Sequence, residues 1–147
     1  MRKVLSLLLC VGIALVVSST AFAQSAPPAT GPNLTIGLVM VGPYNDHGWS
    51  QANYEGVQYV TSKLPGTKMV YIDRANTADR PGTTVSQLGE SLVAQGAKLV
   101  IFSSDDMTDE AIKFAEDHPD IFVILTSGSQ QWKDGKNYLP LPNMVNV

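Results

Sequence analysis

The sequence is poor in the residues that most metal, redox and disulfide chemistry requires. Its 147 residues contain one cysteine and two histidines, and charged residues make up only 16%. A single cysteine cannot form an intramolecular disulfide, so the fold must be stabilised by its apolar core. Because the histidines, His47 and His118, are far apart in the sequence, we expect no transition-metal site.

The sequence also lacks a strong charge excess and the common catalytic motifs. It has 10 basic and 13 acidic residues, which is not the composition of a nucleic-acid-binding protein. Gly42-Pro43 and Gly48 do not form a phosphate-binding glycine pattern, and Ser127-Gly128-Ser129 does not form a nucleophile elbow. We therefore predict a protein that is not an enzyme and has no cofactor.

The first 23 residues have the pattern of a cleavable secretory signal peptide. Arg2 and Lys3 precede a nearly uninterrupted apolar run, residues 4–17, and Ala21-Phe22-Ala23 provides the small residues of a cleavage site. The run is shorter than the roughly 20 residues that span a bilayer, so a retained membrane span is the weaker alternative. The sequence predicts an exported, periplasmic protein whose mature chain does not cross a membrane.

Cys10 is poorly placed for a lipid anchor, because Leu9 precedes it and the apolar run continues beyond it. We expect a mature chain without cysteine and without a lipid anchor. Loss of Arg2 and Lys3 leaves 8 basic and 13 acidic residues, a net charge of −5. Residues 24–33 contain three prolines and no large apolar side chain, which predicts a disordered leader before a domain at 34–147.

From residue 34 the sequence alternates between strand and helix patterns. Short apolar runs predict strands at 34–41, 68–72, 98–102 and 121–125, and helical spacing predicts helices at 49–63, 83–95 and 107–117. Residues 143–147 resemble the start of a fifth strand. Repeated strand-helix-strand units predict an α/β fold, a parallel sheet flanked by helices.

Ligands of such sheets bind beyond the carboxyl ends of the strands, where three polar loops are expected here. Trp49 is placed to stack on a planar ring, although an aromatic residue there is more often part of the core. Asn45 and Asp46 can contact a ligand or cap the following helix, and Asp105 and Asp106 fit capping better than acid–base chemistry. The candidate ligand-binding residues are Asn45, Asp46, Trp49, Ser103, Ser104, Asp105, Ser127 and Gly128.

Three segments carry a family resemblance: IGLVMVGPYNDHGWSQANYEGVQYV at 36–60, LVAQGAKLVIFSSDDM at 92–107 and PNMVNV at 142–147. Together they resemble the BMP family of ABC-transporter solute-binding proteins, also called basic membrane proteins. The NDHGWSQ run followed by YEG is the most specific part. The resemblance implies a Rossmann-like type I periplasmic binding fold whose two lobes close over a ligand.

The resemblance further implies that the ligand is a purine nucleoside or purine base, delivered to an ABC permease in the inner membrane. Trp49 would be the stacking platform, and Asn45 and Asp46 would supply polar contacts. Ser103, Ser104 and Asp105 would join from the third strand, and Ser127 or Gly128 from the fourth. Family members have a second lobe, so the sequence is expected to correspond to a truncated form, the N-terminal lobe only.

Other functions remain open on the sequence alone. The same fold serves ligand sensors that report to a membrane kinase or regulator. A secreted α/β enzyme whose catalytic residues lie in a missing portion is a second alternative. A cytoplasmic transcription regulator conflicts with the signal peptide and with the lack of a DNA-binding helical segment.

Overall fold

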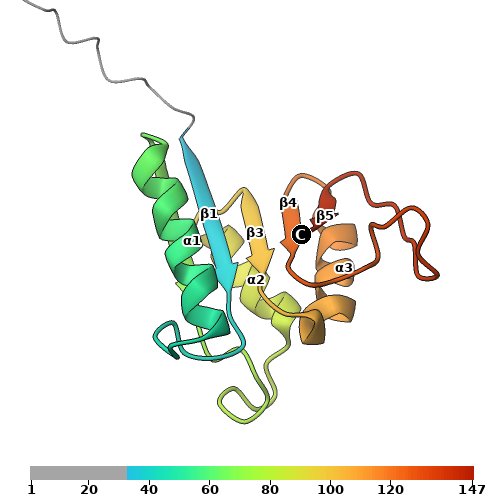
Figure 1. Cartoon of the computed structure of the whole chain (residues 1–147), viewed down its shortest axis with the longest axis horizontal. Coiled ribbons are helices and arrows are strands. Elements are labelled where there is room, and N and C mark those ends of the chain that lie inside the picture. Colours follow the sequence, from blue (N-terminus) through green and yellow to red (C-terminus); the bar gives the residue numbers. More distant parts are fainter. Residues whose placement is uncertain (1–32) are drawn as a thin grey trace, which may run out of the picture.

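The computed structural model describes residues 33–147, so the predicted signal peptide and nearly all of the predicted leader lie outside the described residues. The described chain forms a five-stranded, fully parallel sheet with strand order β2-β1-β3-β4-β5 (Figure 1). This confirms the predicted α/β fold class. The elements are β1 (Leu34–Val39), α1 (Trp49–Lys63), β2 (Thr67–Ile72), α2 (Val85–Ala94), β3 (Leu99–Phe102), a 3-10 turn η1 (Asp105–Met107), α3 (Thr108–Asp117), β4 (Phe122–Leu125) and β5 (Met144–Asn146).

Strand β1 is buried on both faces, as its continuous apolar sequence predicts. Ile36 and Leu38 pack with Val57 of α1, whereas Val39 belongs to the core under α2 and α3. A Cβ at Gly37 would lie 3.1 to 3.2 Å from Leu92 and Ala97, so glycine allows α2 to approach the strand closely. The central strand therefore connects two separate apolar clusters.

The helix ends follow the local sequence signals. Thr84 and Gln87 form a reciprocal capping box at the start of α2. After α2, Gly96 adopts a positive φ of 95°, the left-handed conformation in which helices commonly end at glycine. The predicted helix at 107–117 begins one residue later, at Thr108, because η1 occupies Asp105–Met107 and is capped by the Ser104 side chain.

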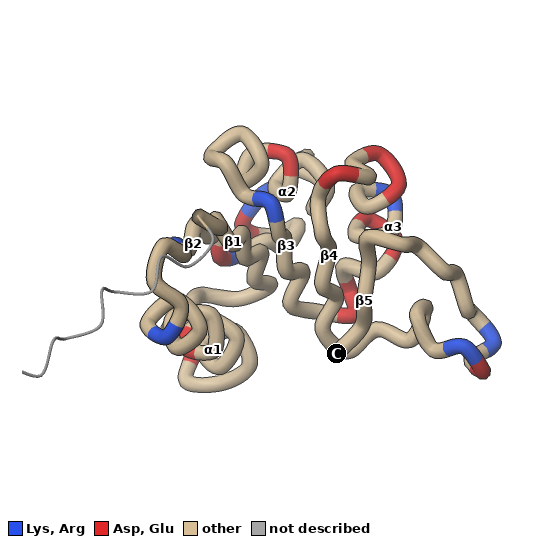
Figure 2. The backbone as a smooth tube through the Cα atoms, turned by 90° about the horizontal axis from the view of Figure 1, so that it is seen from above, with Lys and Arg blue, Asp and Glu red and all other residues tan. Residues whose placement is uncertain are grey.

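The helices lie on opposite faces of the sheet, with α1 on one side and α2 and α3 on the other (Figure 2). Beneath α2 and α3, Val100, Phe102, Val123 and Leu125 are completely buried. On the α1 side, Leu99, Ile101 and Ile124 are only partly buried. One face of the sheet is thus closed and the other is partly open.

The fifth strand that the sequence predicts is present, and β5 pairs in parallel with β4. A loop at 126–143, without a helix, joins the two strands. The Asn143 side-chain amide donates to the carbonyl oxygens of Ala115, His118 and Ile121 at 2.9 to 3.1 Å. These bonds hold the start of β5 against the end of α3. Within residues 33–147, no helix is both long and apolar enough to span a bilayer.

Candidate ligand-binding site

Parallel pairing brings the loops after β1, β3 and β4 to one edge of the sheet, and all eight candidate residues lie on them or in the first turn of α1. Trp49 lies in that first turn, and its indole Nε1–H donates to the carbonyl oxygen of Ser103. This bond joins the loops after β1 and β3. Trp49 as a residue remains 50% exposed, so part of it is accessible to a ligand.

The Asp46 carboxylate caps the start of α1. Its Oδ1 accepts from the backbone N–H groups of Gly48 at 2.8 Å and Gln51 at 3.0 Å, and its Oδ2 accepts from that of Ser50 at 3.1 Å. The Gln51 bond is the largest cause of a lowered pKa for the Asp46 carboxyl group. The Ser50 side chain contributes a further hydrogen bond that lowers the same pKa, so the roughly four acceptor positions of the carboxylate are largely occupied within the protein. Asn45 beside it is exposed.

Ser103 and Ser104 are both buried but use their hydroxyl groups differently. The Ser104 Oγ accepts from the Asp106 N–H at 3.3 Å and so caps η1. The Ser103 side chain is completely buried, and its Oγ has no hydrogen-bond partner among the described residues. An unpaired buried hydroxyl costs free energy, and this one is enclosed by protein and lines none of the hollows described below.

Asp105, Ser127 and Gly128 line one polar hollow of about 400 Å³ between the loops after β3 and β4. Its other lining residues are Asp106, Thr108, Asp109, Ser129 and Gln130. A side chain at Gly128 would overlap the Asn146 amide and place Cβ 2.5 Å from Leu125 Cδ2. Ser127 has a positive φ of 65°, a strained conformation for a non-glycine residue. The loop after β4 is therefore held in one particular shape.

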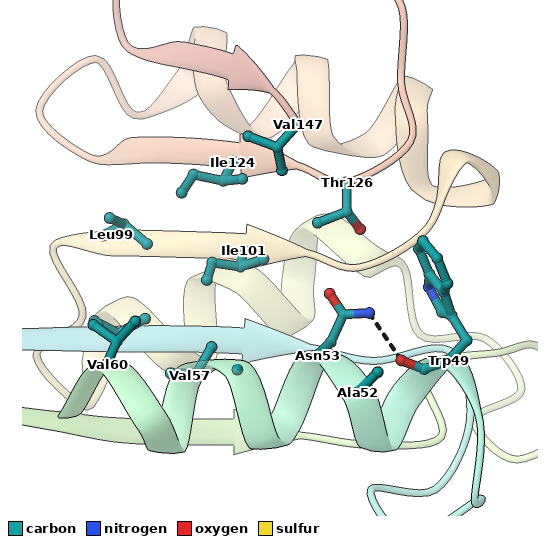
Figure 3. A pocket seen from close by; sticks show the side chains of 12 residues that line it. Trp49, Ala52, Asn53, Val57, Val60, Leu99, Ile101, Ile124, Thr126 and Val147 are labelled. Atoms are coloured by element: carbon teal, nitrogen blue, oxygen red, sulfur yellow. Dashed lines mark hydrogen bonds between the residues drawn. The ribbon is translucent and has the colours of Figure 1, made fainter. Parts of the chain in front are cut away.

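Trp49 lines a different concavity, an apolar groove of about 520 Å³ between α1 and the open part of the sheet (Figure 3). The indole lies near Thr126 at the end where the strands finish, and Val60 and Leu99 lie toward the other end. The structure thus brings the eight predicted residues to one edge but divides them. Trp49 belongs to the groove, Asp105, Ser127 and Gly128 to the polar hollow, and neither concavity includes Asn45, Asp46, Ser103 or Ser104.

The sequence did not indicate the loop between β2 and α2. Asn76 and Thr83 line a hollow of about 250 Å³ together with Asp106 and Met107, again at the carboxyl edge. The Asn76 side chain accepts from the N–H groups of Ala78 and Asp79 and donates to the Val41 carbonyl. The sequence feature that could have indicated this loop is the Asn-Thr-Ala-Asp turn, whose Asn76 side chain bonds to the chain just after β1. No cluster of metal-ligating side chains occurs within residues 33–147.

No family model and no curated protein matches the sequence. Among solved structures, the fold is similar to that of an ABC transporter solute-binding protein from Conexibacter woesei DSM 14684, with a TM-score of 0.60 and 16% identity. It is also similar to ABC transporter solute-binding proteins from Aeropyrum pernix K1, with a TM-score of 0.58 and 13% identity. Both alignments cover 77% of this chain, but only 34% and 28% of the respective solved chains.

These comparisons establish the fold, an α/β architecture shared with solute-binding proteins of ABC transporters. The chain spans about a third of the length of the solved proteins it matches. The more specific resemblance to the BMP family remains a prediction.

Proposed function

We propose that this chain is the N-terminal ligand-binding lobe of an exported solute-binding protein that serves an ABC importer. It captures a small polar ligand of the purine type, a free base or a nucleoside, and performs no catalysis. The ligand contacts favour a closed state of the complete receptor, which the permease in the inner membrane recognises.

The observation that carries the proposal is the polar hollow between the loops after β3 and β4, at the carboxyl edge of a parallel sheet. The likeness to two solute-binding proteins supports the class, since their fold is the same.

The purine preference rests on the chemistry of the edge together with the resemblance to the BMP family. A purine has a π face and a rim of hydrogen-bond donors and acceptors. The half-exposed Trp49 suits the face, and the exposed Asp105, with Ser127 in the same polar hollow, suits the rim. A ligand with the wrong rim would leave these groups unpaired, which is a strong basis for selectivity.

Tryptophan fluorescence tests the proposal, because the described chain has one tryptophan at the site and one outside it. Trp49 is at the carboxyl edge, whereas Trp132 is 63% exposed in the loop before β5. The Trp132→Phe variant is expected to show a saturable change with adenosine, guanosine or hypoxanthine. The matched Trp49→Phe variant is expected to show none.

The same samples distinguish capture from the alternatives. Ligand recovered unchanged after prolonged incubation, at a stoichiometry of one per chain, supports a binding protein; conversion to a product would indicate an enzyme. If neither variant responds to any purine, or if D-ribose produces an equal response, the purine assignment is wrong.

A further inference from the structure

The loop between β2 and α2, residues 73–84, lies at the carboxyl edge but contributes no residue to the polar hollow. It projects beyond the ends of the strands and forms no helix or strand of its own (Figure 1). Loops of about a dozen residues without regular structure are uncommon in compact domains, and many of them serve binding. This loop is therefore a candidate for a second contact with the ligand.

The loop is held in one shape by the Asn76 side-chain amide. Its oxygen accepts from the backbone N–H groups of Ala78 and Asp79 at 3.0 and 2.9 Å. Its Nδ2 donates to the Val41 carbonyl at 3.0 Å and to the Asp79 carboxylate at 2.8 Å. These bonds use every position of the amide, so Asn76 shapes the loop and does not itself contact a ligand. Arg74 has a positive φ of 54°, which a non-glycine residue adopts only when its surroundings impose it. Because the loop is ordered in advance, a ligand would not lose free energy in ordering it.

The hollow between this loop and η1 has an apolar floor and a polar rim. Its volume is about 250 Å³, below the ~300–1,000 Å³ of a pocket that encloses a whole drug-sized ligand, so it suits one part of a ligand. Thr77 and Thr83, both exposed, provide hydroxyl groups at the rim. The floor consists of apolar residues that are buried or partly buried, Val41, Ala75, Val85 and Met107. Such a surface fits a small ring that has a C–H face and several hydroxyl groups.

Asp106 connects this hollow to the polar hollow, because it is the one described residue that lines both. It is exposed, and none of the ion pairs among the described residues includes its carboxylate. Its backbone N–H donates to the Ser104 hydroxyl oxygen, which fixes it in η1 between the two hollows. A ligand seated in the polar hollow can therefore extend past Asp106 into the second hollow.

The charges of the two hollows restrict the ligand. Among the described residues, no Lys, Arg or His lines either hollow, whereas Asp105, Asp106 and Asp109 all line the polar one. A phosphate group would lie beside these carboxylates without a cationic partner and would be repelled. Hydroxyl groups instead donate to a carboxylate in charge-assisted bonds, and they can donate to or accept from the threonine hydroxyls. The second hollow therefore suits an uncharged part of a ligand that carries hydroxyl groups.

We propose that the hollow between residues 73–84 and η1 is a second subsite, which takes the pentose of a nucleoside while the base occupies the polar hollow. The Asp106 carboxylate accepts hydrogen bonds from the sugar hydroxyls, and Thr77 and Thr83 complete the polar rim. The inference rests on the proposed function, that the ligand is of the purine type. It selects a nucleoside over a free base and over a nucleotide.

Amide shifts of the ¹⁵N-labelled protein, titrated separately with four ligands, test the subsite. Adenosine should shift the amides of Thr77, Thr83 and Met107 together with those of Ser127 and Gly128. Adenine should shift only the last two and should bind about tenfold more weakly, because it lacks the charge-assisted bonds to Asp106. 2′,3′-Dideoxyadenosine should bind no better than adenine, and adenosine 5′-monophosphate should bind more weakly than adenosine.

Two substitutions and a matched control assign the effect to the subsite. Asp106→Asn should weaken adenosine binding about tenfold and leave adenine and 2′,3′-dideoxyadenosine binding unchanged. Thr83→Val, which keeps the shape of the side chain, should weaken adenosine binding about threefold. Asp109→Asn is the control, since this carboxylate lines only the polar hollow and its loss should affect adenine and adenosine to the same extent. The amide spectrum of each variant shows directly that it is folded.

Three results would overturn the subsite and leave the proposed function in place: equal affinities for adenine and adenosine, unshifted Thr77 and Thr83 amides with saturating adenosine, or an equal loss of both ligands in Asp106→Asn. Failure of every purine to bind would overturn the proposed function and the subsite with it. The two kinds of failure are therefore distinguishable.

Discussion

The two faces of the sheet differ in how completely this chain builds them. Beneath α2 and α3, one continuous cluster includes Phe102, Phe114 and Leu125, none of them exposed. On the α1 side, a four-residue cluster around Leu38 and Met40 sits next to an open apolar groove. The comparison indicates that the closed face, under α2 and α3, contributes most of the free energy of unfolding of the described domain. The open face and the carboxyl edge are exposed and available for binding.

We expect the largest difference in unfolding free energy between substitutions at two neighbouring residues of β3. Phe102→Ala should lower the free energy of unfolding by about 3–5 kcal/mol, because it removes a completely buried ring that contacts Phe114 edge-on. Ile101→Ala, on the open face, should cost less, about 1–2 kcal/mol. Urea unfolding measures both. Equal losses would mean that the two faces contribute alike.

A pair of helical glycines gives opposite effects on the two faces. At Gly89 a Cβ would lie 2.8 Å from Phe114, so Gly89→Ala should destabilise by about 1–3 kcal/mol. At Gly56 a Cβ meets nothing within 4 Å, so Gly56→Ala should stabilise by up to about 1 kcal/mol through helix propensity. Thermal unfolding shows the sign of each change. A destabilising Gly56→Ala would be evidence that the groove is already filled in this chain.

The adjacent serines after β3 extend the comparison to the sheet edge. Ser104→Ala removes the cap of η1 and should cost about 0.5–2 kcal/mol. Ser103→Ala removes an unpaired hydroxyl and should leave stability nearly unchanged or raise it slightly. Urea unfolding measures both changes. A larger loss for Ser103→Ala than for Ser104→Ala would mean that the Ser103 hydroxyl has a hydrogen-bond partner in solution.

The smallest predicted effect is the contribution of Asp46 to the stability of the fold, which depends on pH. Bonds from backbone N–H groups, that of Gln51 first, lower the pKa of its carboxyl group in the folded protein below 3.8, the ordinary value. The stabilisation from the ionised Asp46 is therefore complete above about pH 3.8 and is lost as the pH falls through the lowered pKa. The stability difference between the native protein and Asp46→Asn should shrink on acidification. A difference that grows instead would contradict the capping geometry.

The fold was largely predictable because its signals are local. Short apolar runs and helical spacing specify where the elements lie, and the order of strands and helices specifies a parallel sheet. The fifth strand was also visible, although only three residues form it.

The site was less predictable because it depends on contacts between distant residues. The bond from the Trp49 indole to Ser103 joins positions 54 residues apart, and no spacing rule reveals it. Residues 49, 52, 56, 57 and 60 share one helical side, as the sequence indicates, but only the structure shows that this side borders an open groove. Likewise, the sequence left open whether Asp46 caps a helix, whereas the structure shows three backbone bonds to its carboxylate.

In the proposed function, the loops after β1, β3 and β4 form one wall for a purine-type ligand. Two-dimensional ¹H–¹⁵N spectra of the labelled protein, titrated with adenosine and guanosine, report on this wall residue by residue. We expect saturable shifts of the Trp49 indole N–H and of the backbone amides of Ser103 to Asp105 and of Ser127 and Gly128, with the Trp132 indole N–H unmoved. Absence of saturable shifts, or shifts confined to Trp132 and the α2–α3 face, would contradict the proposed wall.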